Sequence, residues 1–155
     1  MGDCMAAVDV ETQTTIARPR HEVAAYASNL GNATAWYANI TEVKGDYAGP
    51  VEMGAEFAFV AEFLGRRLVY TYEVVEHVPD TRLVMCTAEG PFPMETIYEW
   101  EEAADGSTRM TLRNRGEPSG FARIGAPVSA RAMRRASNKD LARLKGILEA
   151  EPGNS

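Results

Sequence analysis

The longest helical pattern in this chain runs from Pro127 to Glu149 and reads PVSARAMRRASNKDLARLKGILE. Its small and apolar residues recur at steps of three and four, which places them on one side of a helix. Pro127 stands where a helix can begin, and Pro152-Gly153 stops it. A lone amphipathic helix must bury its apolar side against another element, so the rest of the chain has to supply that surface. The apolar side consists of Ala130, Met133, Ser137, Leu141, Leu144 and Leu148.

The composition is that of a soluble globular protein. The 155 residues are 45% hydrophobic and 25% charged, which suits one domain over residues 1–155 with an ordered core at about 6–150. No apolar run is long enough to span a membrane and the first residues do not form a signal peptide, so we expect no membrane insertion. Two cysteines, Cys4 and Cys86, are too few for a disulfide framework. We expect reduced thiols and a cytoplasmic location.

The charge is unevenly distributed along the chain. Residues 1–115 carry 9 Lys and Arg against 18 Asp and Glu, a net −9, whereas residues 116–155 carry 7 against 4, a net +3. An acidic body argues against nucleic acid as a partner. The basic residues of the long helix are interpreted as a solvated face that offsets the acidic body. The alternative is that this helix contacts an anionic partner.

The residues before the long helix predict mainly strands. Alternation between Val8 and Ile16 predicts a half-buried strand, after which Pro19 opens a short helix and Trp36 lies in a second one. A meander of six strands then follows, separated by turn residues. We expect these strands at 40–47, 56–63, 68–74, 82–87, 95–101 and 109–115, with residues 116–126 as the connection to the long helix.

The last two strands allow an internal test of which face is solvated. Asp105-Gly106 is a strong hairpin signal. A hairpin closed there places acidic side chains of one strand beside basic side chains of the other, and such cross-strand pairs belong in water. The other face, with Tyr98 and Trp100, is therefore expected inside. The predicted neighbours are Glu95, Glu99 and Glu101 on one strand and Arg109, Arg113 and Arg115 on the other.

This order of elements and several local signatures resemble the START-like superfamily, also called SRPBCC or Bet v 1-like, and within it the polyketide cyclase/dehydrase-like group. The resemblance extends over nearly the whole chain, and it is the order of the signatures that makes it specific. They stand here as Thr15 to Pro19 with Val23, Asn32 to Trp36, Gly54 before the strand of Phe57, Tyr72 to Leu83, Gly106 to Arg109 and Leu141 to Glu149.

The resemblance implies an α+β helix-grip fold, in which a curved seven-stranded antiparallel sheet wraps around the C-terminal helix and leaves an apolar cavity. Members of the superfamily bind lipids, sterols, polyketides, quinones or plant hormones, a minority catalyse cyclisation or dehydration of polyketides, and others bind proteins. The group has no universal catalytic motif, so the resemblance assigns no catalytic residue. The oligomeric state stays open between monomer and homodimer.

The inward-facing residues are rich in aromatic side chains with a few polar groups. Such a lining suits a mostly apolar ligand oriented by a few hydrogen bonds. The alternative for each residue is a place in a filled core. The predicted ligand-binding residues are Trp36, Phe57, Phe59, Tyr70, Tyr72, Tyr98, Trp100, Met110, Phe121, Ile124 and Val128.

Signals for catalysis are few. His21 and His77 are isolated, no nucleophile or phosphate-binding motif occurs, and no cluster predicts a metal site. We therefore expect no cofactor and no metal. The leading hypothesis is a binding protein for a hydrophobic small molecule such as a lipid, a polyketide or an isoprenoid-like ligand. The alternatives are a polyketide aromatase/cyclase or dehydratase, with candidate groups in Tyr70, Tyr72, Tyr98 and Asn114, and a protein-interaction module.

Overall fold

The computed structural model describes residues 8–45, 51–63, 65–89, 94–116 and 126–150. The chain begins with strand β1 (Val8–Ile16), followed by α1 (Arg20–Ser28), the 3-10 turn η1 (Leu30–Asn32) and α2 (Ala33–Trp36). Six further strands precede the long helix α3 (Ala126–Ala150). They are β2 (Ile40–Gly45), β3 (Glu56–Phe63), β4 (Arg66–Val78), β5 (Arg82–Glu89), β6 (Met94–Glu102) and β7 (Thr108–Gly116).

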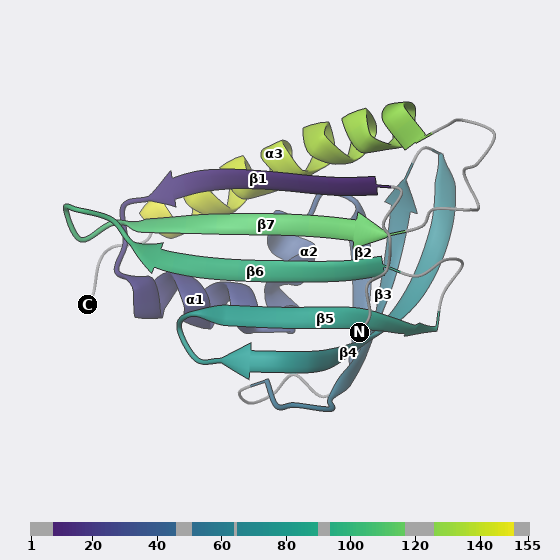
Figure 1. Cartoon of the computed structure of the whole chain (residues 1–155), viewed down its shortest axis with the longest axis horizontal. Helices are drawn as coiled ribbons and strands as arrows, with labels where there is room; N and C mark the ends of the chain where they lie inside the picture. The colour runs from purple at the N-terminus through teal and green to yellow at the C-terminus, as the bar shows by residue number, and fades with distance from the viewer. Residues whose placement is uncertain (1–7, 46–50, 64, 90–93, 117–125, 151–155) are drawn as a thin grey trace.

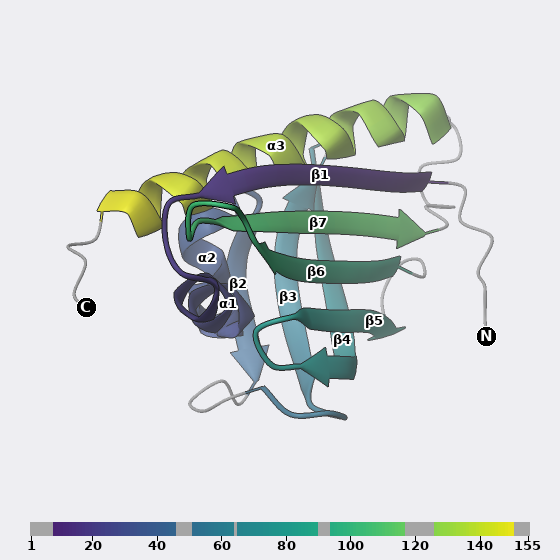
Figure 2. The same cartoon turned by 60° about the vertical axis from the view of Figure 1, so that its left-hand side comes forward.

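The strands form one antiparallel sheet of seven strands in the order β1-β7-β6-β5-β4-β3-β2. Figures 1 and 2 show α3 running alongside β1, with α1 and α2 below it and β2 and β3 turning round behind. The curved sheet thus encloses the helices on one side. The helix-grip fold that the resemblance implies is confirmed, and each strand has the one buried face that the alternation predicted.

The C-terminal half of α3 packs into the filled part of the core. Leu141, Leu144 and Leu148 are at most 5% exposed and belong to a cluster with the inward side chains of β6 and β7. Tyr98, Trp100, Met110 and Leu112 on those two strands are at most 2% exposed. The predicted inward face is therefore confirmed.

Side chains of α3 also cover the free edge of β1. Arg134 Nη1 donates to the carbonyl oxygen of Glu11 at 3.2 Å, and Lys145 Nζ donates to that of Thr15 at 2.7 Å. An uncovered strand edge offers backbone groups to another chain. These two bonds occupy carbonyls on one edge of the sheet, which leaves β2 as the other edge.

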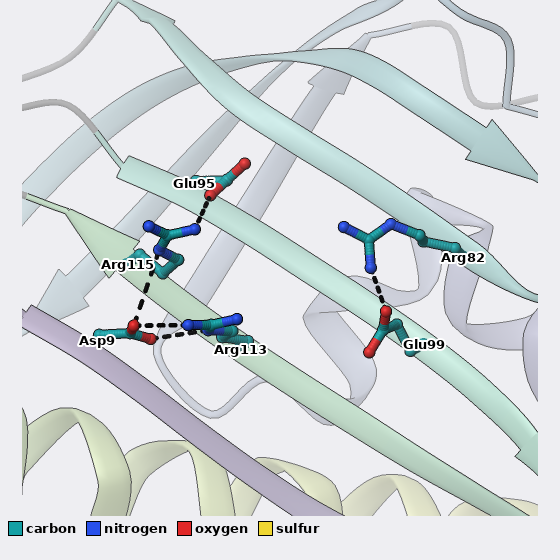
Figure 3. Close-up of polar contacts among 6 residues, drawn as sticks. All are labelled: Asp9, Arg82, Glu95, Glu99, Arg113 and Arg115. Atoms are coloured by element: carbon teal, nitrogen blue, oxygen red, sulfur yellow. Dashed lines mark hydrogen bonds and ion pairs between the residues drawn. The ribbon is translucent and has the colours of Figure 1, made fainter. Parts of the chain in front are cut away.

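The outer face of the sheet carries a network of ion pairs, shown in Figure 3. Arg115 pairs with Glu95 at 3.3 Å and Arg109 with Glu101 at 3.4 Å, as the hairpin predicted. Glu99, the third acidic residue of the predicted set, pairs instead with Arg82 on β5.

The partner of Arg113 is also not the predicted one. Arg113 binds Asp9 on β1 through two bonds of 2.8 and 2.7 Å. The hairpin register explains both corrections, because it sets Glu99 opposite Thr111 and Arg113 opposite Ile97. Their charged partners then come from the strands on either side.

Arg113→Gln is expected to lower the free energy of unfolding by less than about 1 kcal/mol, because exposed ion pairs contribute little. The guanidinium of Arg113 holds the pKa of Asp9 below its ordinary value of 3.8. Denaturant titration of the variant and the parent in 20 mM and 1 M NaCl measures the loss. The difference should shrink in high salt, because salt screens exposed charges. A loss that does not depend on salt would contradict the assignment.

Candidate functional site

A cavity of about 150 Å³ lies between α3 and the strands on the β2 side of the sheet. Its apolar wall comes from β3, β4, β5 and β6, and includes Phe59, Leu68, Tyr70, Tyr72, Met85 and Met94. The N-terminal and middle turns of α3 form the opposite wall with Met133, Ala136, Ser137 and Asp140. The long helix thus has two parts: one fills the core and the other lines the cavity.

One group of polar side chains connects the strands to α3 across the cavity. Thr96 Oγ1 donates to Asn114 Oδ1 at 2.8 Å and lies 3.4 Å from the Tyr72 hydroxyl. Asn114 Nδ2 donates to Ser137 Oγ on α3 at 3.4 Å. Each of these residues lines the cavity. These hydrogen-bonded side chains offer hydroxyl and amide groups to a ligand that is otherwise held by apolar contacts.

A second polar group lies where α2 meets β2. Tyr37 follows α2, and its hydroxyl is 2.8 Å from the hydroxyl of Tyr98 on β6. Asp140 is only 4% exposed, and its Oδ1 accepts a hydrogen bond of 3.0 Å from the backbone N–H of Ala38. This bond attaches the connection between α2 and β2 to α3. It also places a carboxyl group in the cavity wall near two phenols.

The four cavity phenols are held in their neutral form. Burial raises the pKa of Tyr70, and burial also raises that of Tyr72 to about 12. The pKa values of Tyr37 and Tyr98 are raised in the same direction, mainly by burial. A phenolate is therefore not accessible near neutral pH, and these side chains act as hydrogen-bond donors or acceptors.

Asp140 is the cavity group that titrates near neutrality. Burial raises the pKa of its carboxyl from 3.8 to about 6, although the Ala38 N–H and the nearby Arg143 and Lys139 act in the opposite direction. Both forms are thus available between pH 5 and 7. A carboxyl group with this pKa, in a largely apolar pocket, is suited to exchange a proton with a bound molecule.

The predicted ligand-binding residues divide between the cavity and the filled core. Phe59, Tyr70, Tyr72 and Tyr98 line the cavity, and so does the candidate Asn114. The other four described residues lie outside the cavity wall, because they pack in the core cluster that contains the leucines of α3. These four, Trp36, Phe57, Trp100 and Met110, are at most 1% exposed within the core cluster.

Three predicted positions lie outside the part of the chain that the structure describes. Phe121 and Ile124 precede α3, and Val128 lies in its first turn, where the side chain is not described. Their contact with a ligand stays a prediction. The same holds for the nature of the connection at residues 117–125 and for Cys4.

Asp140 is the ionisable residue of the cavity that the sequence reasoning missed, and Met85, Met94 and Ala136 were missed with it. Alternation along the strands indicates no inward carboxylate, whereas this carboxylate comes from α3. The signal was present in the helical spacing, since Asp140 stands three residues after Ser137 and four before Leu144, on the same side of the helix. A charged residue on an apolar stripe indicates a buried and specialised position.

Neither a metal-binding group nor a membrane-spanning helix is found in the described part of the chain. No group of three or more His, Cys, Asp or Glu side chains there has the arrangement of a metal site. None of the described helices has both the length and the hydropathy to cross a membrane.

The sheet, the enclosed helix and the cavity between them define a START-like ligand-binding fold. The chain belongs to the family described as "Polyketide cyclase / dehydrase and lipid transport", whose model matches residues 7–149. A search of curated proteins finds no relative of this sequence.

Solved structures with low sequence identity share the fold. TTHA0849 from Thermus thermophilus superposes with a TM-score of 0.78 at 18% identity, covering 93% of this chain and 99% of the other. The Zhui aromatase/cyclase from Streptomyces sp. R1128 has a TM-score of 0.71 at 16% identity, with 91% and 93% covered. A START superfamily protein from Mycobacterium smegmatis has a TM-score of 0.67 at 15% identity, with 91% and 94% covered.

Proposed function

We propose that this protein binds a hydrophobic small molecule, such as a lipid, a polyketide or another aromatic or isoprenoid-like compound, in the cavity beneath α3. The observation that supports this most directly is the lining: aromatic and aliphatic side chains surround a space with two polar groups at fixed places. The family description, which includes lipid transport, agrees with it. Phe59, Tyr70, Tyr72 and Tyr98 are the proposed contact residues.

The size of the cavity indicates how a larger ligand enters. A volume of about 150 Å³ holds a molecule of about the size of benzene, whereas cavities for larger ligands measure roughly 300–1,000 Å³. Met85, Met94 and Met133 lie in the wall, and methionine side chains change shape with little cost. We expect these three side chains to move outward when a ligand larger than one ring binds.

Ala136→Phe is expected to weaken binding at least about tenfold, because a phenyl ring added at a cavity-lining position fills a space of this size. Mass spectrometry of compounds extracted from the purified parent protein first identifies the ligand. Its affinity is then measured by titration calorimetry for both proteins. Ala142→Phe is the matched control, because Ala142 lies on an exposed part of α3 and its substitution should leave affinity unchanged. Extraction of no apolar compound, or equal affinity for Ala136→Phe, would contradict the proposal.

A second function has one specific observation in its favour. Asp140 places a titratable carboxyl in the cavity, close to the hydroxyls of Tyr37 and Tyr98. An aromatase/cyclase or dehydratase needs a group that removes a proton beside a carbonyl and a donor that stabilises the enolate formed. In this alternative Asp140 removes the proton and the phenols donate hydrogen bonds to the oxygen.

Tyr72→Phe and Tyr98→Phe distinguish the two functions. Each removes one hydroxyl but keeps the aromatic ring, so a carrier should keep its affinity within about threefold, as expected for one hydrogen bond of modest net value. An enzyme that uses the hydroxyl should instead lose turnover by about 100-fold or more. Turnover is measured with a poly-β-keto compound as the substrate. Unchanged turnover in both variants would show that neither the Tyr72 nor the Tyr98 hydroxyl takes part in catalysis.

A further inference from the structure

The first half of α3 carries a row of cations on the side opposite the cavity. Arg131, Arg134, Arg135 and Lys139 are exposed and lie with Asn138 on one face of the helix. We call these four cations the basic ridge. Residues 126–139 contain no acidic residue, so the ridge has no opposite charge within its own segment.

The cations of the basic ridge repel one another along α3, although Asp140 attracts Lys139. Arg131, Arg135 and Lys139 follow one another at steps of four, and like charges at that spacing repel on a helix. No ion pair joins these three to an acidic side chain in the described ranges. The rest of α3 is different, because Lys145 pairs there with Glu149 at 2.8 Å. An external anion would relieve the repulsion that the fold leaves in place.

Arg134 has a structural contact that the other three lack. Its guanidinium donates to the carbonyl of Glu11 at 3.2 Å and helps to cover the edge of β1. Arg131, Arg135 and Lys139 can therefore be changed without removing a described hydrogen bond or ion pair of the fold, although Lys139 also attracts the Asp140 carboxyl. These three are the residues on which a test should act.

We propose that the basic ridge docks the protein onto an anionic lipid surface, so that α3 lies against the headgroups while the cavity lies beneath the same turns of the helix. The choice of a lipid surface rests on the proposed function, since an apolar ligand resides in bilayers. Two further features support it. The ridge is the outer side of a helix, which suits a flat partner, and it contains no exposed aromatic or large aliphatic side chain of the kind that anchors protein interfaces.

The acidic remainder of the molecule determines the orientation of docking. Residues 1–115 carry a net −9 and are repelled by an anionic surface, whereas α3 carries 6 basic residues against 2 acidic ones. Basic residues close to such a surface each contribute roughly fivefold to affinity, and the contribution is lost within about 10 Å at 0.1 M salt. Docking should therefore be confined to the face that α3 presents.

Vesicle flotation tests the proposal with the full chain. Vesicles of phosphatidylcholine containing 30% phosphatidylserine should carry the parent protein in 50 mM NaCl, and vesicles of phosphatidylcholine alone should not. The triple variant Arg131→Gln, Arg135→Gln and Lys139→Gln should bind at least about tenfold more weakly, as expected from the loss of three cations. A matched triple, Lys44→Gln, Arg67→Gln and Arg109→Gln, removes the same charge from exposed positions on β2, β4 and β7 and should bind like the parent.

The outcomes separate this proposal from the proposed function. Absence of flotation with anionic vesicles, or equal flotation of the two triple variants, would overturn docking through the basic ridge. Retention of the parent by a DNA column at the salt concentration at which flotation fails would assign the ridge to nucleic acid instead. The assay needs no bound ligand, so Ala136→Phe should float like the parent. A protein that floats but yields no extractable ligand would keep the docking surface and lose the carrier function.

Discussion

Leu144→Ala is expected to lower the free energy of unfolding by about 2–5 kcal/mol, because it opens a cavity in the core. Leu144 is 0% exposed and lies in the core cluster between α3 and the sheet. Removing its branched end leaves a void that the surrounding side chains fill only in part. Urea denaturation followed by circular dichroism measures the loss, and the slope of the transition should not change.

Met133→Ala is the matched comparison on the same helix. Met133 is partly buried and faces the cavity, so its removal enlarges an existing space and does not create a new one. We expect a loss of no more than about 1 kcal/mol, well below that for Leu144. Equal losses at the two positions would show that both halves of α3 pack alike, and the division of the helix into a core half and a cavity half would be wrong.

Most of the fold was predictable from the sequence because the relevant signals are local. Alternation along each strand identified the buried face, and Asp105-Gly106 identified the hairpin between β6 and β7. The ion-pair partners of Glu99 and Arg113 were not predictable in this way. They come from β5 and β1, and only the strand order places those strands beside the hairpin.

Alternation along the strands could not predict which inward-facing residues line the cavity and which lie in the filled core. Phe57 and Phe59 alternate on the same face of β3, yet only Phe59 lines the cavity. Trp100 and Tyr98 on β6 differ in the same way. Packing against the helices decides the outcome, since Phe57 and Trp100 lie in the core cluster with Trp36 of α2 and the leucines of α3. Alternation reports only which face is inward.

Asp140→Asn is expected to raise the free energy of unfolding at pH 8 by about 1–3 kcal/mol. The carboxyl has a pKa of about 6 in the folded protein against 3.8 as its ordinary value, and each pKa unit corresponds to about 1.36 kcal/mol. Because the folded pKa is the higher one, the folded state binds more protons between pH 4 and 6, and stability falls as the pH rises through this range. Asparagine carries no charge and keeps an oxygen that can accept the Ala38 N–H, so it avoids this cost.

The pH dependence distinguishes this explanation from a general effect of removing an acid. Below about pH 3 the parent carboxyl is protonated in both states, so the advantage of Asp140→Asn should disappear there. Asp9→Asn is the control, because Arg113 lowers the pKa of Asp9 and gives the opposite sign, a loss of stability above about pH 4. Urea denaturation of both variants from pH 3 to 8 measures the two trends. An Asp140→Asn protein that is no more stable than the parent at pH 8 would mean that the ionised carboxyl is compensated, and its assignment as the titrating group of the cavity would then be wrong.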